Sequence, residues 1–290
     1  MKNTSPPLIP RPDRPVDPIT IPVIREIHKA SLELGLPVML VGATARIILL
    51  ENIFGLNVGR TTNDIDFAFA LDNWPQFEAF KAHLVKHANF EEAKGSAQRL
   101  FVRLPELKHR HMVDLIPFGN IEATPGHIAW PPDMSFIMNV TGFADALAAS
   151  LGVTIAPGLT IQIASLPGIA MLKIFAWSDR GQEDPKDASD LILLLRGYHE
   201  AGNSERIYEE AITTMEAVGY NIELAGAWLL GRDAAAIALP VTAAKLIALL
   251  EGNDRRRLIE DMAKAMRGQE DAIEQADQLL VQFTKGFKES

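Results

Sequence analysis

An Asp-x-Asp pair at the start of an apolar run constrains the fold of this chain more than any other feature. Asp64 and Asp66 stand at the beginning of residues 64–71, in which all remaining residues are apolar. Side chains of a strand alternate between its two faces, so the two carboxylates share one face. They repel each other unless a cation lies between them, and such oxygen ligands suit Mg²⁺ or Mn²⁺. The pair therefore indicates a divalent-metal site, the alternative being a strand end with two solvated acids.

A strand, a glycine and a helix are predicted just before this pair. Residues 37–41 form an apolar run, Gly42 allows a tight turn, and residues 44–54 show helical apolar spacing with Thr44 as a possible cap. Free N–H groups at a helix start bind phosphate, whereas the alternative is a turn used for packing alone. The candidate nucleotide-binding residues are Gly42, Ala43, Thr44 and Arg46, the last either contacting the nucleotide or pairing with a nearby acid.

A third carboxylate stands in the middle of another short apolar run. Asp114 lies between Val113 and Leu115. Burying an unpaired charge is costly, so this aspartate either alternates toward solvent or has a partner. If Asp114 lies beside Asp64 and Asp66, the three carboxylates can hold two metal ions about 3.5–4 Å apart.

Together these motifs resemble the DNA polymerase β-like nucleotidyltransferase superfamily. Within it, residues 20–200 look most like the AbiEii/AbiGii abortive-infection toxins and their MenT relatives. A later segment is similar to that group's Lys…Arg…Lys/Arg-Asp-x-x-Asp motif, with Lys173, Arg180, Lys186, Asp187 and Asp190 at the matching positions. One departure is the turn, which is Gly42-Ala43 here and usually Gly-Gly or Gly-Ser in the superfamily.

The resemblance implies transfer of a nucleoside monophosphate from an NTP to an acceptor hydroxyl, with release of pyrophosphate. Asp64, Asp66 and Asp114 would be the metal ligands, and Asp114 would also accept the hydroxyl proton. The remaining implied roles are phosphate contacts for Arg60 and Lys173, a hydroxyl contact for Thr62, and orientation of Lys173 or the metal for Asp187.

Lys173 can also be interpreted without the family. It is the one charged residue in residues 168–177, so it either extends to the surface or binds an anion. Asp187 and Asp190 are three residues apart and share a face of the next predicted helix. They would orient Lys173 or the metal, or else form surface pairs with Lys186 or Arg180.

Composition limits the remaining choices. The chain has 290 residues and a net charge of −9. It contains no cysteine, which excludes disulfides and thiolate metal sites. The start of the chain is polar and Pro-rich rather than basic and then apolar, and residues 234–250 are too short and too interrupted to span a bilayer. We therefore expect a cytoplasmic protein with no membrane partner.

The acceptor is left open by the sequence. The toxin resemblance implies tRNA 3′ ends and a cognate antitoxin, whereas an acidic chain suits a small cationic acceptor of the aminoglycoside kind better. A CCA-adding enzyme and a nucleotide-binding regulatory module without transfer activity are further alternatives. A tRNA footprint would have to be a local patch on one rim of the site, for which the candidates are Lys94, Arg99, Arg103 and residues 108–110.

The predicted fold is an α/β (α+β) nucleotidyltransferase domain followed by an α-helical domain. The domains expected are a Pro-rich arm over 1–19, the α/β domain over 20–164 and the helical domain over 165–290, with nucleotide in the cleft between the last two. Helices are expected at 21–35, 44–54, 74–88 and 143–151, strands at 37–41, 65–70, 98–104 and 111–117, a loop over 119–132, and a hairpin of 153–156 with 159–163. From residue 165 onward everything reads as helix, with breaks at Gly181, Gly202, Gly231 and Pro240.

Overall fold

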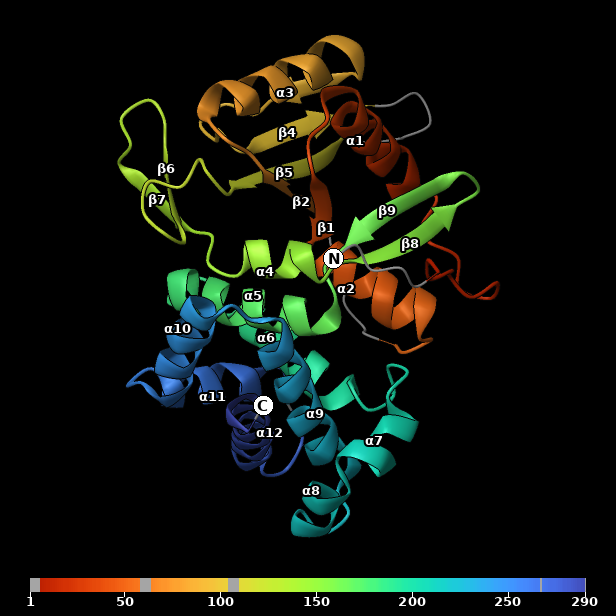
Figure 1. Ribbon diagram of the computed structural model, residues 1–290, viewed down its shortest axis with the longest axis vertical. Helices are drawn as coiled ribbons and strands as arrows, with labels where there is room; N and C mark the ends of the chain where they lie inside the picture. Colours follow the sequence, from red (N-terminus) through yellow and green to blue (C-terminus); the bar gives the residue numbers. More distant parts are fainter. Residues whose placement is uncertain (1–5, 58–63, 104–109, 267, 290) are drawn as a thin grey trace. The chain divides into compact units, whose positions relative to one another are not determined.

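The computed structural model describes residues 6–57, 64–103, 110–266 and 268–289. It divides into two compact units, Met1–Ser165 and Leu166–Ser290. The first unit contains a mixed sheet with helices, and the second is entirely helical over its described residues (Figure 1). This architecture agrees with the predicted fold class. None of the helices among the described residues is long and apolar enough to cross a bilayer.

A seven-stranded sheet forms the centre of the first unit, with strand order β3-β4-β5-β2-β1-β9-β8. Its strands are β1 (Val38–Val41), β2 (Asp64–Ala70), β3 (Phe90–Glu92), β4 (Arg99–Val102), β5 (His111–Phe118), β8 (Leu151–Ala156) and β9 (Leu159–Ile163). Strand β2 runs parallel to β5 and antiparallel to β1, while β4 runs antiparallel to β5. The predicted strands and the hairpin are therefore present, with ends shifted by one or two residues.

Two helices, α1 (Thr20–Leu34) and α3 (Trp74–His87), pack against each other and against the sheet (Figure 1). The alternating side chains of β2 supply this core, since the ring of Phe69 lies 4.5 Å from that of Phe80 on α3. Helix α3 begins where the side chain of Asn73 accepts a hydrogen bond from the backbone N–H of Gln76. The aspartates of β2 occupy the alternate positions and are half-buried.

The predicted helix 44–54 consists of α2 (Gly42–Ile47), which continues as the π-helical segment η1 (Ile48–Ile53). It begins at Gly42 rather than at residue 44, with Val41 at the N-cap position and no side-chain cap. The interpretation of Thr44 as the cap is therefore wrong. A shorter helix, α4 (Phe143–Ala148), replaces the one predicted over 143–151.

The segment 119–132 was expected to be a loop but contains a strand. Strand β6 (His127–Trp130) pairs with β7 (Phe136–Asn139) as a separate two-stranded sheet. Both strands have four residues and lie among turn-forming residues, so their local sequence resembles a loop. Strand β3, with three residues, was missed for the same reason. Pairing with a neighbouring strand, rather than local apolar periodicity, stabilises such short strands.

The second unit contains only helices among its described residues, as expected. They are α5 (Leu166–Arg180), α6 (Lys186–Gly197), α7 (Ser204–Glu210), α8 (Ile212–Ala217), α9 (Ile222–Ile237), α10 (Pro240–Glu251), α11 (Arg255–Lys264) and α12 (Ala272–Lys288). Gly181, Gly202 and Pro240 lie at or between helix ends, but Gly231 does not break α9. A Cβ added at Gly231 would lie 2.0 Å from the carbonyl oxygen of Phe283 on α12. This glycine therefore permits close packing of two helices.

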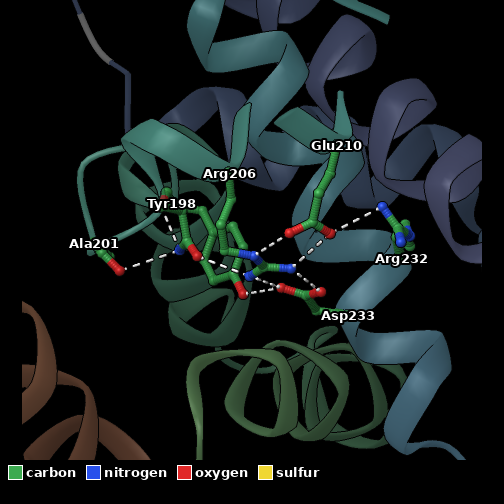
Figure 2. Close-up of polar contacts among 7 residues, drawn as sticks. Tyr198, Ala201, Arg206, Glu210, Arg232 and Asp233 are labelled. Atoms are coloured by element: carbon green, nitrogen blue, oxygen red, sulfur yellow. Dashed lines mark hydrogen bonds and ion pairs between the residues drawn. The ribbon is translucent and has the colours of Figure 1, made fainter. Parts of the chain in front are cut away.

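A network of charged side chains ties α7 and α9 together at the end of α6 (Figure 2). Both oxygens of Asp233 accept hydrogen bonds from the guanidinium of Arg206, at 2.7 and 2.8 Å. The hydroxyl of Tyr198 also donates to Asp233, and burial together with this carboxylate raises the pKa of that hydroxyl. Glu210 is shared between Arg206 and Arg232. These contacts link α7 and α9 to the residue that follows α6.

The described part of the Pro-rich arm packs on the first unit rather than fraying. Leu8 forms an isolated parallel bridge with Val153 of β8. The side-chain amide of Asn52 donates to the backbone carbonyls of Arg14 and Pro15, at 3.2 and 3.1 Å. Val16 is buried. The arm is therefore held by backbone hydrogen bonds and one apolar anchor.

Candidate active site

Three aspartates meet on two neighbouring strands of the sheet. Strands β2 and β5 are parallel and in a register that places Asp66 directly beside Asp114. Asp64 lies two residues before Asp66 on the same face. One oxygen of each carboxylate lies within 4.8 Å of the others, and all three residues are half-buried. The structure thus brings together the three carboxylates that the sequence singled out.

Gly42 supports the central carboxylate by leaving room for it. Its φ is +71°, and an added Cβ would lie 2.0 Å from Oδ2 of Asp66. A residue with a side chain would therefore be strained and would displace this carboxylate. Thr44 donates its hydroxyl hydrogen bond to the backbone carbonyl of Asp64, at 3.1 Å. This hydrogen bond links the turn to the first residue of β2. Ala43, between Gly42 and Thr44, is half-buried.

Arg99 is a site residue whose role was not predicted from the sequence. Its Nε and Nη2 donate to Oδ1 and Oδ2 of Asp114 at 2.8 and 2.7 Å. Hydrogen bonding to Asp114 raises the pKa of the Arg99 guanidinium, burial opposes that effect, and attraction to Asp114, Asp64 and Asp66 adds to it. Arg99 was expected in a tRNA-binding patch, but its guanidinium is already engaged by an acid of the site. Only the register of β4 with β5, which pairs Arg99 with Asp114, reveals this.

The donor set fits a divalent cation. Three carboxylates provide hard oxygen ligands close together, and partial burial strengthens their field relative to open solvent. Among the residues that the structure describes, no other trio of histidine or acidic side chains converges in this way. The three acids and Arg99 together carry two more negative than positive charges, which favours binding of Mg²⁺ or Mn²⁺.

The other predicted nucleotide contacts of this unit are less direct. Arg46 has no exposed surface. Of its two interpretations, burial therefore favours pairing with a nearby acid over contact with the nucleotide. Arg60 and Thr62 lie outside the described residues.

In the helical unit, Lys173 forms a compact charge cluster with three side chains. Its Nζ lies 2.9 Å from Oδ1 of Asp187 and 2.6 Å from Oδ2 of Asp190. Arg180 donates through Nε to Oδ2 of Asp187 at 2.8 Å. Lys173 is only 7% exposed, so it does not extend into solvent, whereas Lys186 pairs with Asp184 instead.

The charges of this cluster stabilise one another. Burial opposes the charged form of Lys173, but attraction to Asp187 and Asp190 outweighs it and raises the pKa of the ammonium. Burial likewise opposes the charged form of Asp187, yet Lys173 and Arg180 hold the pKa of its carboxyl below the usual value. Asp187 therefore orients Lys173, as one of the two interpretations of the sequence proposed, and also pairs with Arg180.

The other described residues of the predicted basic patch are Lys94, Arg103 and Arg110, and all three are exposed. Arg110 stacks on the ring of Phe101, with its guanidinium carbon 4.0 Å from the ring centre. Residues 108–109 lie outside the described parts of the chain. With Arg99 engaged by Asp114, the cations described here do not establish a continuous surface for nucleic acid.

Comparison with known proteins places these motifs in context. The family model described as "Nucleotidyl transferase AbiEii toxin, Type IV TA system" matches residues 31–281. No curated protein sequence matches the chain significantly.

Several solved structures of nucleotidyltransferases show weak similarity. The solution structure of the antibiotic-resistance factor ANT(2'')-Ia is 15% identical and covers 69% of this chain and 97% of its own, with a TM-score of 0.36. The antigenic nucleotidyltransferase-like protein from Paracoccidioides brasiliensis is 14% identical, covers 70% and 93%, and has a TM-score of 0.41. The Thermotoga maritima CCA-adding enzyme complexed with tRNA is 12% identical, covers 95% and 80%, and has a TM-score of 0.26. TM-scores this low carry no functional argument, so the assignment depends on the family match.

Proposed function

This chain belongs to the AbiEii nucleotidyltransferase toxin family, and from that premise we propose that Asp64, Asp66 and Asp114 catalyse transfer of a nucleoside monophosphate to an acceptor hydroxyl. The observation that carries the proposal is the parallel register of β2 with β5, which sets Asp66 beside Asp114. Two-metal transfer enzymes need such a group of convergent carboxylates. The enzyme class follows from the family, and the convergence of these three residues supports their assignment.

The proposed step displaces pyrophosphate. The acceptor oxygen bonds to the α-phosphorus of the NTP while the bond from that phosphorus to the bridging oxygen breaks. Asp114 takes the proton of the acceptor hydroxyl, and Asp64 with Asp66 holds the cation site in place. A bound divalent cation would neutralise the phosphate charge that develops during transfer. Positioning and charge neutralisation account for most of the catalysis in this reaction class.

The remaining contacts of the nucleotide are part of the same proposal. Gly42, Ala43 and Thr44 would lie against its phosphates, with Gly42 also leaving room for the carboxylate of Asp66. Lys173 would supply positive charge to the triphosphate, positioned by Asp187. Arg60 and Thr62 complete the set proposed from the family motif, with Arg46 as a structural support.

We propose tRNA 3′ ends as the acceptor and a cognate antitoxin as the protein partner, because the family is one of toxins. The test is incubation of purified protein with each labelled NTP, Mg²⁺ or Mn²⁺, and either total tRNA or an aminoglycoside panel. The acceptor that becomes labelled identifies the substrate class, and the Asp66→Asn variant is the matched control. Failure to label any acceptor with any NTP would contradict the proposed reaction.

A salt titration examines the acceptor independently of turnover. If about six phosphates are contacted, raising salt from roughly 50 to 200 mM should weaken tRNA binding by about 10³-fold. A change of only a few-fold would exclude an extended nucleic-acid interface.

One observation favours a small cationic acceptor as the second candidate. A groove of about 540 Å³ lies between the β3–β4 turn and the β6–β7 hairpin, and its lining includes Glu92, Asp133 and the ring of Phe136. Gln98, the residue before Arg99, also lines it. Glu92 already pairs with Lys81 at 2.9 Å, so the acidic Asp133 and the aromatic Phe136 are the residues that suit an organic cation. Labelling of an aminoglycoside rather than tRNA would support this candidate.

A further inference from the structure

The pairing of Arg99 with Asp114 is built into the sheet. Strand β4 runs antiparallel to β5 with Arg99 and Asp114 directly opposite each other. The guanidinium meets the carboxylate as a fork, with both nitrogen–oxygen distances under 3 Å. Charge-assisted bidentate pairs of this kind are among the strongest hydrogen-bonded contacts in proteins. Because both strands belong to the central sheet, their pairing places the two side chains next to each other.

The bidentate contact with Arg99 limits which oxygens of Asp114 are available to another ligand. Both carboxylate oxygens accept a hydrogen bond from Arg99, so a cation must share these oxygens or displace a donor. The guanidinium also repels a cation bound between the carboxylates, since it is already attracted by Asp64 and Asp66. The Asp114 side chain is 15% exposed, which limits screening of this repulsion by water.

We propose that Arg99 is a positioning residue that holds Asp114 in the nucleotide-free enzyme and weakens binding of free divalent cations at the three aspartates. The cation would then enter together with the nucleotide, whose phosphates supply the ligands and negative charge that Arg99 offsets. This inference rests on the proposed metal-dependent function of the same site. It assigns to Arg99 control over when the site takes up its cation, in place of the nucleic-acid contact predicted from the sequence.

The size of the effect follows from Coulomb's law. A unit charge about 6 Å from a divalent cation opposes its binding by roughly 1.4 kcal/mol even at the dielectric constant of water, a factor of about ten in affinity. Partial burial of the pair strengthens this repulsion relative to open water. Removing the charge of Arg99 should therefore tighten binding of the free cation by about tenfold or more.

The experiment is a Mn²⁺ titration of nucleotide-free protein, with free Mn²⁺ followed by electron paramagnetic resonance. Arg99→Met should bind Mn²⁺ about tenfold or more tightly than the wild type. Arg99→Lys keeps the charge and should remain within a few-fold of the wild type. Arg25→Met, which removes an exposed cation from α1, is the matched control and should leave the affinity unchanged.

Several outcomes would overturn the inference. These are unchanged or weaker Mn²⁺ binding by Arg99→Met, equal tightening by Arg99→Lys, and no Mn²⁺ binding by any variant. If Arg99→Met does not fold, Arg99→Gln, which also lacks the charge, replaces it with the same expected tightening. Because the titration needs neither NTP nor acceptor, tighter binding without any nucleotide transfer would contradict the proposed function and leave the role of Arg99 intact.

Discussion

The two charged groups of this protein differ in how their charges are matched. Asp64, Asp66 and Asp114 lie together on the sheet, Arg99 pairs with Asp114, and all three acids are half-buried. In the helical unit, Asp187 and Asp190 meet Lys173 and Arg180, and both carboxylates are almost fully buried. In these contacts among the described residues, the first group combines three acids with the guanidinium of Arg99, whereas the second combines two acids with two bases.

This difference distinguishes a candidate ligand-binding site from a charge cluster that stabilises the fold. A matched and buried group needs no ligand to stabilise it, and loss of any member leaves a buried charge behind. A group with excess negative charge gains stability when a cation binds. The aspartates of the sheet therefore have the character of a metal site, and the Lys173 cluster has that of a structural element.

The largest effect is expected for Asp66→Asn. Loss of a ligand to the cation should cost several kcal/mol of transition-state stabilisation and abolish nucleotidyl transfer. The fold should persist, because the amide has the shape of the carboxylate and relieves its repulsion with Asp64. Rate assays test the loss of transfer, and thermal unfolding of metal-free protein tests whether the fold persists. Retention of more than about a tenth of the wild-type rate would contradict the ligand role.

Lys173→Met should destabilise the protein by about 3–5 kcal/mol, because Asp187 and Asp190 would remain buried without their ammonium. Denaturant unfolding measures this loss. We also expect weaker NTP binding and slower transfer, since the methionine keeps the packing of the stem but not its charge.

The control for this variant is Lys186→Met, which should cost less than about 1 kcal/mol because Lys186 and its partner Asp184 are both half-exposed. The comparison between the two charged groups fails if both lysine variants unfold alike. Unchanged stability with weakened NTP binding would make Lys173 a ligand only.

Gly42→Ala should cost about 1–3 kcal/mol of stability and reduce transfer, because φ is +71° and the new Cβ would collide with Asp66. Gly35→Ala is the matched control. Its φ is +65° but nothing lies within 4 Å of the added Cβ, so it should show the backbone strain alone. Equal effects of the two variants on transfer would mean that Gly42 does not position Asp66.

The smallest effect concerns pH. The lowered pKa of Asp187 adds stability that is present above its unfolded value near 3.9 and is lost as the pH falls through the folded value. The raised pKa of Lys173 adds stability that is present below about 10.4 and is lost as the pH rises through the folded value. The unfolding free energy that Lys173→Met removes should therefore be flat between about pH 5 and 9. A slope within this window would contradict the pairing.

Local periodicity was sufficient to predict most elements and the candidate carboxylates. The two-residue repeat placed Asp64 and Asp66 on one face, and the apolar neighbours of Asp114 marked it as unusual. What the sequence did not contain was the order and register of the strands. The pairing of Arg99 with Asp114 was therefore not predicted, and Arg99 was interpreted only as a candidate contact for nucleic acid.

The helical unit illustrates the same limit. Gly231 looked like a break, because glycine lowers helix propensity, but its effect depends on α12 lying against it. Arg46 looked available to a nucleotide, but the fold buries it completely. In each case a contact between segments distant in sequence decided the outcome, and local residue patterns do not encode such contacts.

The parallel register of β2 and β5 also bears on how this protein can diverge. The segments that join α3, β3 and β4 between these two strands can gain or lose residues as long as the register of β4 with β5 is kept. A single insertion inside β5 before Asp114 would instead turn that carboxylate to the opposite face. Relatives that retain the reaction should therefore vary in length between these strands and hardly at all within them.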